Sequence, residues 1–417
     1  MRYALRFLLN NKVLNYKEFR YFLSTRFFLL LSLNMQMTIV AYMAFKLTKD
    51  PLTLGMIGLW EVIPAIGFSL FSGHFVDQRE KRNMMLYCIV GFTLLSVFYF
   101  LLSLPSFLDT VGTQYTVWLI YLGVFIGGAI RAFGSPSNFA LFALLIPKRL
   151  YANGSTWSST AWQLGAVVGP LLGGLAIAYI GFSWSLAAVF GFKLIALFLV
   201  SRIKRKPIMK QTKEPVFKSL KEGLSFVFNT QIILAALALD MFAVLFGGAV
   251  ALLPVYADEI LQVGEVGYGW LRASQGIGAI LMLFILSFVP LKKNAGIKLL
   301  FAVAGFGITT IIFGLSNIFI LSFGMLLLGG MFDAISVVIR GTILQLYTPD
   351  AMRGRVAAVS TMFISSSNEL GAAESGFTAK LMGTVTAVVF GGCMTLGVVG
   401  ITYFKAPKLR QLRMDGK

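Results

Sequence analysis

The sequence contains very few of the residues that catalytic and metal sites usually require. It has one histidine, His74, and two cysteines, Cys88 and Cys393, both within apolar stretches. No disulfide framework, metal cluster or catalytic Cys/His pair can be assembled from this set. No nucleophile with a neighbouring base and no phosphate-binding loop is found either, so a membrane enzyme is disfavoured and no cofactor is expected.

Charged residues are also scarce. They make up 13% of the 417 residues, whereas 57% are hydrophobic, and soluble domains of this length do not have such a composition. Apolar runs of roughly 20 residues, the length that crosses a bilayer core, recur about twelve times. Their centres lie near Leu33, Ala65, Thr93, Gly128, Val167, Ala196, Val244, Ile280, Gly307, Asp333, Leu370 and Met394. Because a helix satisfies its own backbone groups in lipid, we expect an all-α polytopic membrane protein with twelve transmembrane helices.

The few charges that remain are mostly basic, with 36 Lys and Arg against 17 Asp and Glu. With the N-terminus inside, the inner loops hold nearly all basic residues, and the outer loops hold only Lys46 and Lys49 together with several acids. This distribution predicts cytoplasmic N- and C-termini in a cell membrane, expected to be a bacterial inner membrane. It also explains the basic excess without a nucleic-acid partner. The basic, amphipathic first 20 residues are expected to form a retained interfacial helix on the bilayer surface, not a signal peptide.

Glycines mark the fifth predicted span. Gly165, Gly169 and Gly173 recur every fourth residue and Gly174 follows them, so one face of the helix offers a groove for another backbone. Pro170 removes one backbone donor within this span. The pattern predicts a kinked, tightly packed helix that serves helix packing and hinge motion.

A short, charged inner loop follows the second span. Gly73, Asp77, Arg79, Lys81 and Arg82 combine a small residue, an acid at a helix end and three basic side chains. An acid there can accept hydrogen bonds from the free amides of a neighbouring helix start, which predicts a cytoplasmic latch. The alternative is that these charges only set topology.

Several charged residues fall inside predicted spans, where charge is costly and usually functional. Carboxylates in low-dielectric surroundings take up and release protons closer to neutral pH than carboxylates in water. The candidates for proton coupling are Glu61, Arg131, Asp240, Asp333, Glu369 and Glu374. A structural ion pair is the alternative for each. Asp333 and Arg340 lie about 10 Å apart along a helix axis, so a direct pair between them is not expected.

A substrate cavity is predicted around Trp60, Glu61, Arg131 and Gln163. Arg131 favours an anionic group, and aromatic side chains favour a large apolar body. Such aromatic residues also pack against lipid or other helices, so the substrate itself is left open.

The two halves of the sequence repeat each other weakly. The interval from Gly128 to Pro147 equals that from Gly330 to Pro349, which places Arg131 opposite Asp333. The same comparison places residues 164–166 on 370–372 and Arg26 opposite Asp240. We therefore predict an N-terminal six-helix bundle over 1–201, a basic linker over 202–221 and a C-terminal bundle over 222–417, with the coupling chemistry mainly in the second half.

The charged loop resembles the motif Gly-x-x-x-Asp-Arg-x-Gly-Arg-Arg of the major facilitator superfamily. Gly73, Asp77, Lys81 and Arg82 fit that motif, whereas Gln78 and Glu80 depart from it. Residues 165–174 match the superfamily's antiporter motif Gly-x-x-x-Gly-Pro-x-x-Gly-Gly at every defined position. Arg131 resembles the buried arginine in the fourth helix of proton-coupled exporters.

This resemblance implies a monomeric transporter of the proton-antiport branch that includes multidrug and siderophore exporters. Its expected partners are protons, the lipid bilayer and a small amphiphilic or hydrophobic substrate, moved by alternating access. A lipid or lysolipid flippase of the same fold and a proton-coupled uptake carrier are the alternatives within the same fold.

Overall fold

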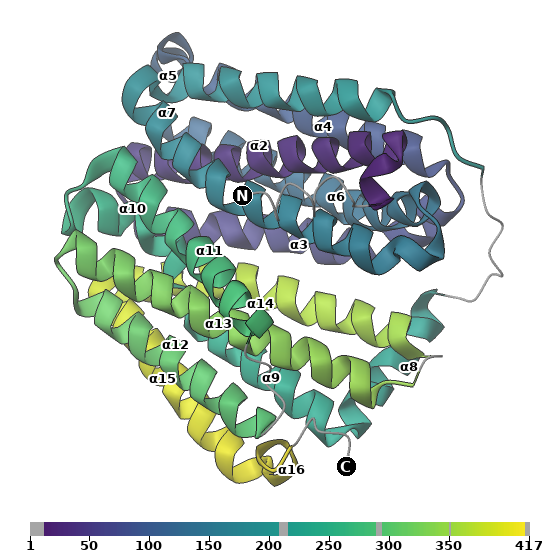
Figure 1. The fold of residues 1–417 in the computed structure, drawn as a ribbon. Coiled ribbons are helices and arrows are strands. Elements are labelled where there is room, and N and C mark those ends of the chain that lie inside the picture. The colour runs from purple at the N-terminus through teal and green to yellow at the C-terminus, as the bar shows by residue number, and fades with distance from the viewer. Residues whose placement is uncertain (1–11, 208–215, 289–293, 350–351, 413–417) are drawn as a thin grey trace. The chain divides into compact units, whose positions relative to one another are not determined.

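The computed structural model describes residues 12–207, 216–288, 294–349 and 352–412, and these residues form helices and no strands (Figure 1). The long helices are α2 (Lys17–Thr48), α3 (Pro51–Asp77), α4 (Lys81–Leu102), α6 (Thr113–Leu145), α7 (Tyr151–Ser201), α9 (Gln231–Phe246), α11 (Gly264–Phe288), α12 (Ala295–Leu315), α13 (Phe319–Tyr347), α14 (Arg353–Met382) and α15 (Thr384–Lys405). Shorter helices are η1 (Lys12–Asn15), α5 (Pro105–Val111), η2 (Lys148–Leu150), α8 (Val216–Asn229) and α16 (Pro407–Arg410).

The helices confirm the twelve predicted spans. Among the described residues, 10 helical stretches are long and apolar enough to cross a membrane. One of them holds two spans, because Gly181 interrupts α7 with a φ of 73°, a backbone conformation that glycine adopts without strain. The remaining span is α14, which is 30 residues long but carries polar and acidic side chains.

The seventh span is broken, which its apolar pattern alone does not reveal. α9 ends at Phe246, and after Gly247 and Gly248 the chain continues as η3 (Ala249–Leu252), α10 (Leu253–Val255) and a π-helical turn, η4 (Tyr256–Ile260). Two adjacent glycines weaken a helix and Pro254 removes a donor just beyond them.

Two compact units make up the chain, and the first contains residues 1–40 and 67–213. Within it, α4 packs against both α6 and α7. Its core is a cluster of buried side chains that includes Phe19, Phe22, Ile89, Leu141 and Val200. The predicted N-terminal interfacial helix falls partly on residues 1–11, which lie outside the described residues.

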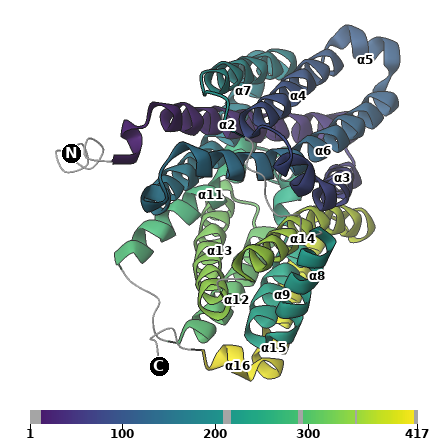
Figure 2. The same ribbon diagram turned by 90° about the vertical axis from the view of Figure 1, so that its right-hand side faces the viewer.

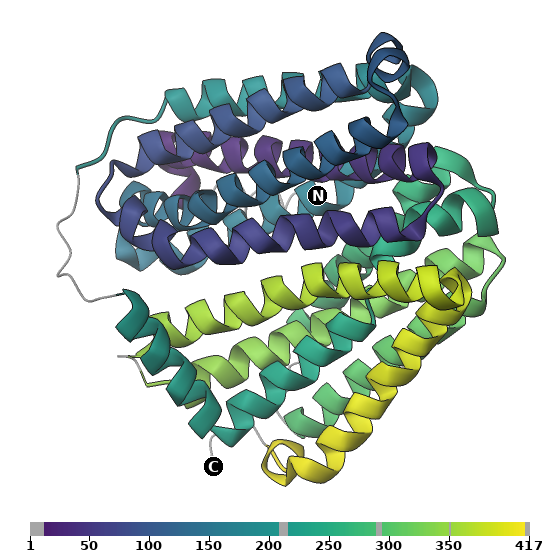
Figure 3. The same ribbon diagram turned by 180° about the vertical axis from the view of Figure 1, so that it is seen from behind.

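The second unit contains residues 41–66 and 214–417, so the far end of α2 and most of α3 pack with the second half. In this unit α13 packs on α11 and α12, and α12 packs on α15 (Figure 1). α8, α9 and α14 also lie side by side (Figure 2). α15, drawn in yellow, leads into the short α16 (Figure 3).

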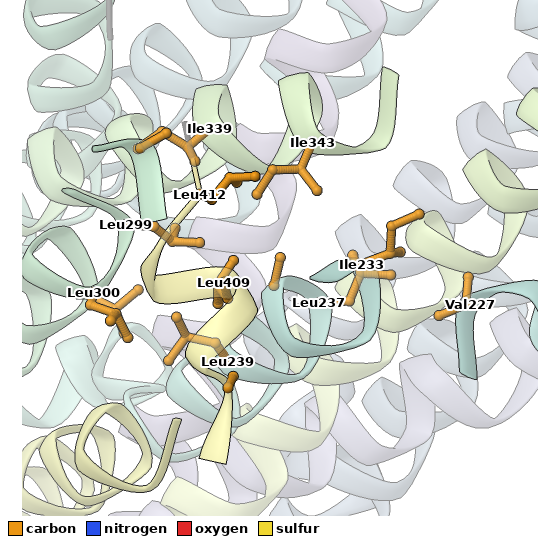
Figure 4. Close-up of a cluster of buried hydrophobic side chains, with 14 of the residues drawn as sticks. Val227, Ile233, Leu237, Leu239, Leu299, Leu300, Ile339, Ile343, Leu409 and Leu412 are labelled. Carbon is orange, nitrogen blue, oxygen red and sulfur yellow. The ribbon is translucent and has the colours of Figure 1, made fainter. Parts of the chain in front are cut away.

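A hydrophobic cluster in the second unit joins α8, α9, α12, α13, α14 and α16, and Figure 4 shows many of its side chains. Its buried members include Ile233, Leu237, Leu299, Ile339 and Leu409. α8 begins at Val216, so the last part of the segment predicted as linker, 202–221, is helical.

Candidate functional site

A buried ion pair links α9 and α13 in the second unit. Arg340 Nη1 pairs with Asp240 Oδ2, and each side chain is only 7% exposed. Ser336 Oγ donates a hydrogen bond of 3.4 Å to Asp240 Oδ1. Ser336 and Arg340 lie four residues apart on one face of α13, so both can reach the same carboxylate.

Asp333 shares that face of α13 and interacts electrostatically with both Asp240 and Arg340. Its side chain is partly exposed, whereas Asp240 is buried. Arg340 Nε has no hydrogen-bond partner among the described residues. Asp333 therefore lies on the same face of α13 as the ion pair, and the partner of Arg340 that the sequence left open is Asp240.

The break in the seventh span lies just beyond Asp240 and is held by α14. A Cβ atom at Gly371 would lie 2.8 Å from the carbonyl oxygen of Val244, and one at Gly248 would lie 2.7 Å from the carbonyl oxygen of Gly371. These glycines let the two backbones touch. An interrupted membrane helix leaves backbone groups without helical partners, and this break does so about two turns beyond Asp240 in the same span.

The glycine groove of the fifth span is filled by α2. A Cβ at Gly165 would lie 2.9 Å from Leu30 Cβ, and one at Gly169 would lie 2.8 Å from Asn34 Cβ. At Gly173 the nearest atom would be Thr38 Cβ, at 3.1 Å. Pro170 and Gly174 are buried in the same helix. The groove therefore brings the two helices into backbone contact, as GxxxG-type packing does.

Lys193 forms a second buried polar cluster, in the first unit. Its side chain has 0% exposure, and Nζ donates to Gln36 Oε1 at 2.5 Å and to the carbonyl oxygen of Phe92 at 3.0 Å. Ser96 Oγ also donates to Gln36 Oε1, at 3.1 Å. No acidic partner of Lys193 occurs among the described residues. In the sequence Lys193 is a single charge within the sixth apolar run, and this signal alone predicts no particular role.

The charged loop after α3 fastens α4 to the end of α7. Arg82 donates to the carbonyl oxygens of Ser201 and Ile203, at 2.8 and 3.2 Å. Lys81 Nζ donates to the carbonyl oxygen of Val76 at 2.6 Å, and Arg79 lies over the Phe75 ring. The side chain of Asp77 and the surroundings of Gly73 lie outside what the structure describes.

Glu80, which departs from the loop motif, has a defined structural role. Its carboxylate accepts from the backbone amides of Arg82 and Asn83 and so caps α4. The backbone amide of Lys206 also donates to it, at 2.8 Å. An acid before a helix that begins with Lys81-Arg82 is the sequence signal that predicts such a cap.

A polar cluster in the second unit joins the end of α2 to the π-helical turn. Asp258 accepts from Lys46, Lys49 and Tyr42. The Tyr42 ring stacks on Tyr268 with their centroids 5.1 Å apart.

Close contacts along α3 and α14 continue this junction. Lys380 Nζ pairs with Asp50 at 2.6 Å. A Cβ at Gly55 would lie 2.9 Å from Gly376 Cα, so two glycines allow α3 and α14 to touch.

The other predicted site residues are spread over both units. Arg131 on α6 and Gln163 on α7 belong to the first unit, whereas Trp60, Glu61, Glu369 and Glu374 belong to the second. All of them are partly exposed. Among the described residues, no group of three His, Cys, Asp or Glu side chains is placed to hold a metal ion.

Residues 22–372 match the family described as the Major Facilitator Superfamily. The enterobactin exporter EntS of Escherichia coli O1:K1 is 24% identical over 411 residues, which cover 92% of this chain and 96% of that protein. The EntS of Shigella boydii serotype 18 has the same identity and coverage.

Solved structures share the fold. A D-xylose-proton symporter superposes with a TM-score of 0.72 at 14% identity, covering 95% of this chain and 100% of the other. A bacterial homolog of the human lysosomal transporter Spinster, solved in an inward-facing and unoccupied conformation, gives 0.70 at 16% identity and covers 94% and 98%.

Proposed function

Because the chain belongs to the Major Facilitator Superfamily, whose members are membrane transporters, we propose that it exports a small amphiphilic or hydrophobic molecule in exchange for protons. The observation that carries this proposal is the group formed by Asp240, Asp333 and Arg340. We assign the proton-coupling step to this group.

Charge balance supports the assignment. Two carboxylates and one guanidinium carry a net negative charge when no proton is bound, and an uncompensated buried charge is costly. A proton bound to one carboxylate neutralises the group. Protonation of Asp240 would also weaken its ion pair with Arg340 and so loosen the contact between α9 and α13. A proton can therefore alter the packing of α9, the helix that ends at the break.

The polar cluster around Asp258 supports alternating access. In the orientation given by the positive-inside rule, Lys46, Lys49 and Asp258 lie at the outer surface of a bacterial inner membrane. There the ends of α2 and α3 are bound to the second half through Asp258 and Lys380. Opening toward the outside would have to break these ion pairs and separate Gly55 from Gly376.

The proposed substrate class rests on similarity to the enterobactin exporter over nearly the whole chain. A siderophore is an amphiphilic molecule, and the partly exposed Arg131 and Gln163 of the first unit offer a cation and an amide to such a ligand. Fold similarity to the D-xylose-proton symporter is compatible with uptake, so the direction of transport requires a direct test.

The test uses the purified full-length protein in liposomes with a pH-sensitive dye in the lumen. Enterobactin, ethidium and D-xylose serve as probes, added with and without an imposed proton gradient. We expect enterobactin or ethidium to move against the proton flux and to dissipate the gradient. D-xylose moving with protons would instead support an uptake carrier.

Variants locate the coupling group in the same assay. Asp240→Asn and Asp333→Asn should abolish substrate-dependent proton flux, and Asp333→Asn should still allow exchange of probe across the membrane. Asp109→Asn removes an exposed acid of α5 and is the matched control. Proton flux in the two site variants equal to that of the control would overturn the assignment.

A further inference from the structure

A polar pocket lies in the first unit, outside the proposed transport machinery. It has a volume of about 410 Å³ and is lined by Lys12, Asn15, Tyr16, Arg149 and Leu150. It thus combines two cations, an amide, a phenol and one apolar side chain. All of these polar groups can donate hydrogen bonds, and none is an anion.

The two cations of this pocket are not matched by acids. Lys12 and Arg149 form no ion pair among the described residues, and both are exposed. The nearest acid along the chain, Glu18, is already bound to Lys206 and to the backbone amide of Lys204. The first 11 residues contain no Asp or Glu. The pocket therefore has an unbalanced positive charge.

Its position places it at the membrane boundary. Residues 12–16 directly precede α2, and residues 149 and 150 directly precede α7. These helices contain the first and fifth spans, which enter the bilayer from the same side. Beneath the polar rim, Leu14, Leu150 and Tyr151 pack against the buried cluster that contains Phe19 and Phe22. A ligand here would meet donors at the rim and hydrocarbon beside them.

We propose that this pocket binds the phosphodiester of an anionic glycerophospholipid in the cytoplasmic leaflet. Lys12 and Arg149 would contact the phosphate oxygens through charge-assisted hydrogen bonds, with Arg149 able to donate in bidentate fashion. Asn15 and Tyr16 would donate to the remaining oxygens or to the glycerol headgroup. The acyl chains would lie beside the starts of α2 and α7, which ordinary solvent-exposed phosphate sites do not offer.

Native mass spectrometry of the full-length protein in detergent tests this proposal. The protein is titrated with phosphatidylglycerol, phosphatidylcholine and inorganic phosphate in separate series. We expect one tight phosphatidylglycerol adduct, weak phosphatidylcholine binding and no phosphate adduct. In Lys12→Gln/Arg149→Gln the affinity for phosphatidylglycerol should fall by about thirtyfold, from two basic residues near the lipid surface.

The matched control is Lys17→Gln/Lys148→Gln, which removes two exposed charges from the adjacent positions outside the pocket. It should retain the affinity of the natural protein, as should the charge-conserving Arg149→Lys to within a few-fold. Equal losses in the two double variants would show a general surface-charge effect and overturn the site. An inorganic phosphate adduct that depends on Lys12 and Arg149, without a lipid adduct, would overturn the lipid assignment.

Discussion

The first and seventh spans are equivalent in the internal repeat predicted from the sequence, yet α2 is continuous and the seventh span breaks at Gly247 and Gly248. The repeat places Asn34 opposite Gly248 and Gly169 opposite Ser375. In the first half, glycine lies on α7 and faces Asn34, whereas in the second half glycine lies at the break and faces Ser375 Oγ. The glycine therefore belongs to opposite partners of the contact in the two halves. Both halves keep a close contact between helices, but only the seventh span is interrupted.

Buried charge differs between the halves in the same way. The first half holds Lys193 with neutral acceptors, whereas the second half holds Asp240 paired with Arg340 beside Asp333. A proton that reaches the second half can break an ion pair, but the Lys193 cluster has no ion pair to break. We therefore propose that switching takes place in the second half and that the first half provides rigid support.

Breaking the ion pair should give the largest effect. Asp240→Ala leaves Arg340 buried without its counter-ion, and removing one partner of a buried pair costs about 3–5 kcal/mol. The double variant Asp240→Leu/Arg340→Met should recover most of this stability while still failing to transport. Unfolding by sodium dodecyl sulfate gives the free energies, with the exposed Asp109→Ala as control. Equal stability of the single and double variants would show that the pair does not contribute as described.

Substitutions at Gly169 and Asn34 test whether it matters which of the two helices carries the glycine. Gly169→Ser should destabilise the first half by about 1–3 kcal/mol, because its Cβ meets α2 with no room to relax. Adding Asn34→Gly reproduces the arrangement of the second half and should recover part of the loss, less about 1 kcal/mol for glycine within a helix.

The same unfolding assay measures this pair of variants. Gly191→Ala is the control, since a Cβ at that position has no atom within 4 Å. A Gly169→Ser protein as stable as Gly191→Ala would contradict the tight contact.

The cluster around Asp258 should give a smaller effect, because its lysines are partly exposed to solvent. Asp258→Asn should shift the balance toward outer opening by about 1 kcal/mol, which is roughly fivefold. The readout is labelling of Thr53→Cys, a buried position near the start of α3, by an impermeant maleimide in a Cys88→Ser/Cys393→Ser background.

Lys49→Gln is the comparison for that experiment, since Lys49 is 52% exposed and its pair should contribute less. Labelling that is unchanged by Asp258→Asn would show that this cluster does not hold the outer side closed.

Lys193→Met should have the smallest effect, within about 1 kcal/mol of the natural protein in either direction. Ser96 Oγ can still donate its single proton to Gln36 Oε1 or to the carbonyl oxygen of Phe92, so at most one of the two acceptors loses its side-chain donor. Thermal unfolding in detergent and the proton-flux assay provide the measurements. A loss of proton flux in this variant would contradict the proposal that proton-dependent switching takes place only in the second half.

The helices were predictable because lipid leaves an apolar segment few alternatives, and all twelve centres fall where expected. Asp240 and Asp333 stood out as charges within apolar runs. Arg340 stood out in the same way, but its pairing with Asp240 did not follow from the sequence, because that pairing depends on how α9 crosses α13. The break in the seventh span had a signal in Gly247, Gly248 and Pro254, which average hydropathy conceals.

Glu80 also joins two helices through a single carboxylate. It caps the start of α4 and accepts from the backbone amide of Lys206, which lies beyond the end of α7. Glu18, near the start of α2, pairs with the side chain of the same lysine. Loss of Glu80 would therefore release the start of α4 and the segment after α7 together, so the residue that departs from the loop motif is the one that holds these two ends in place.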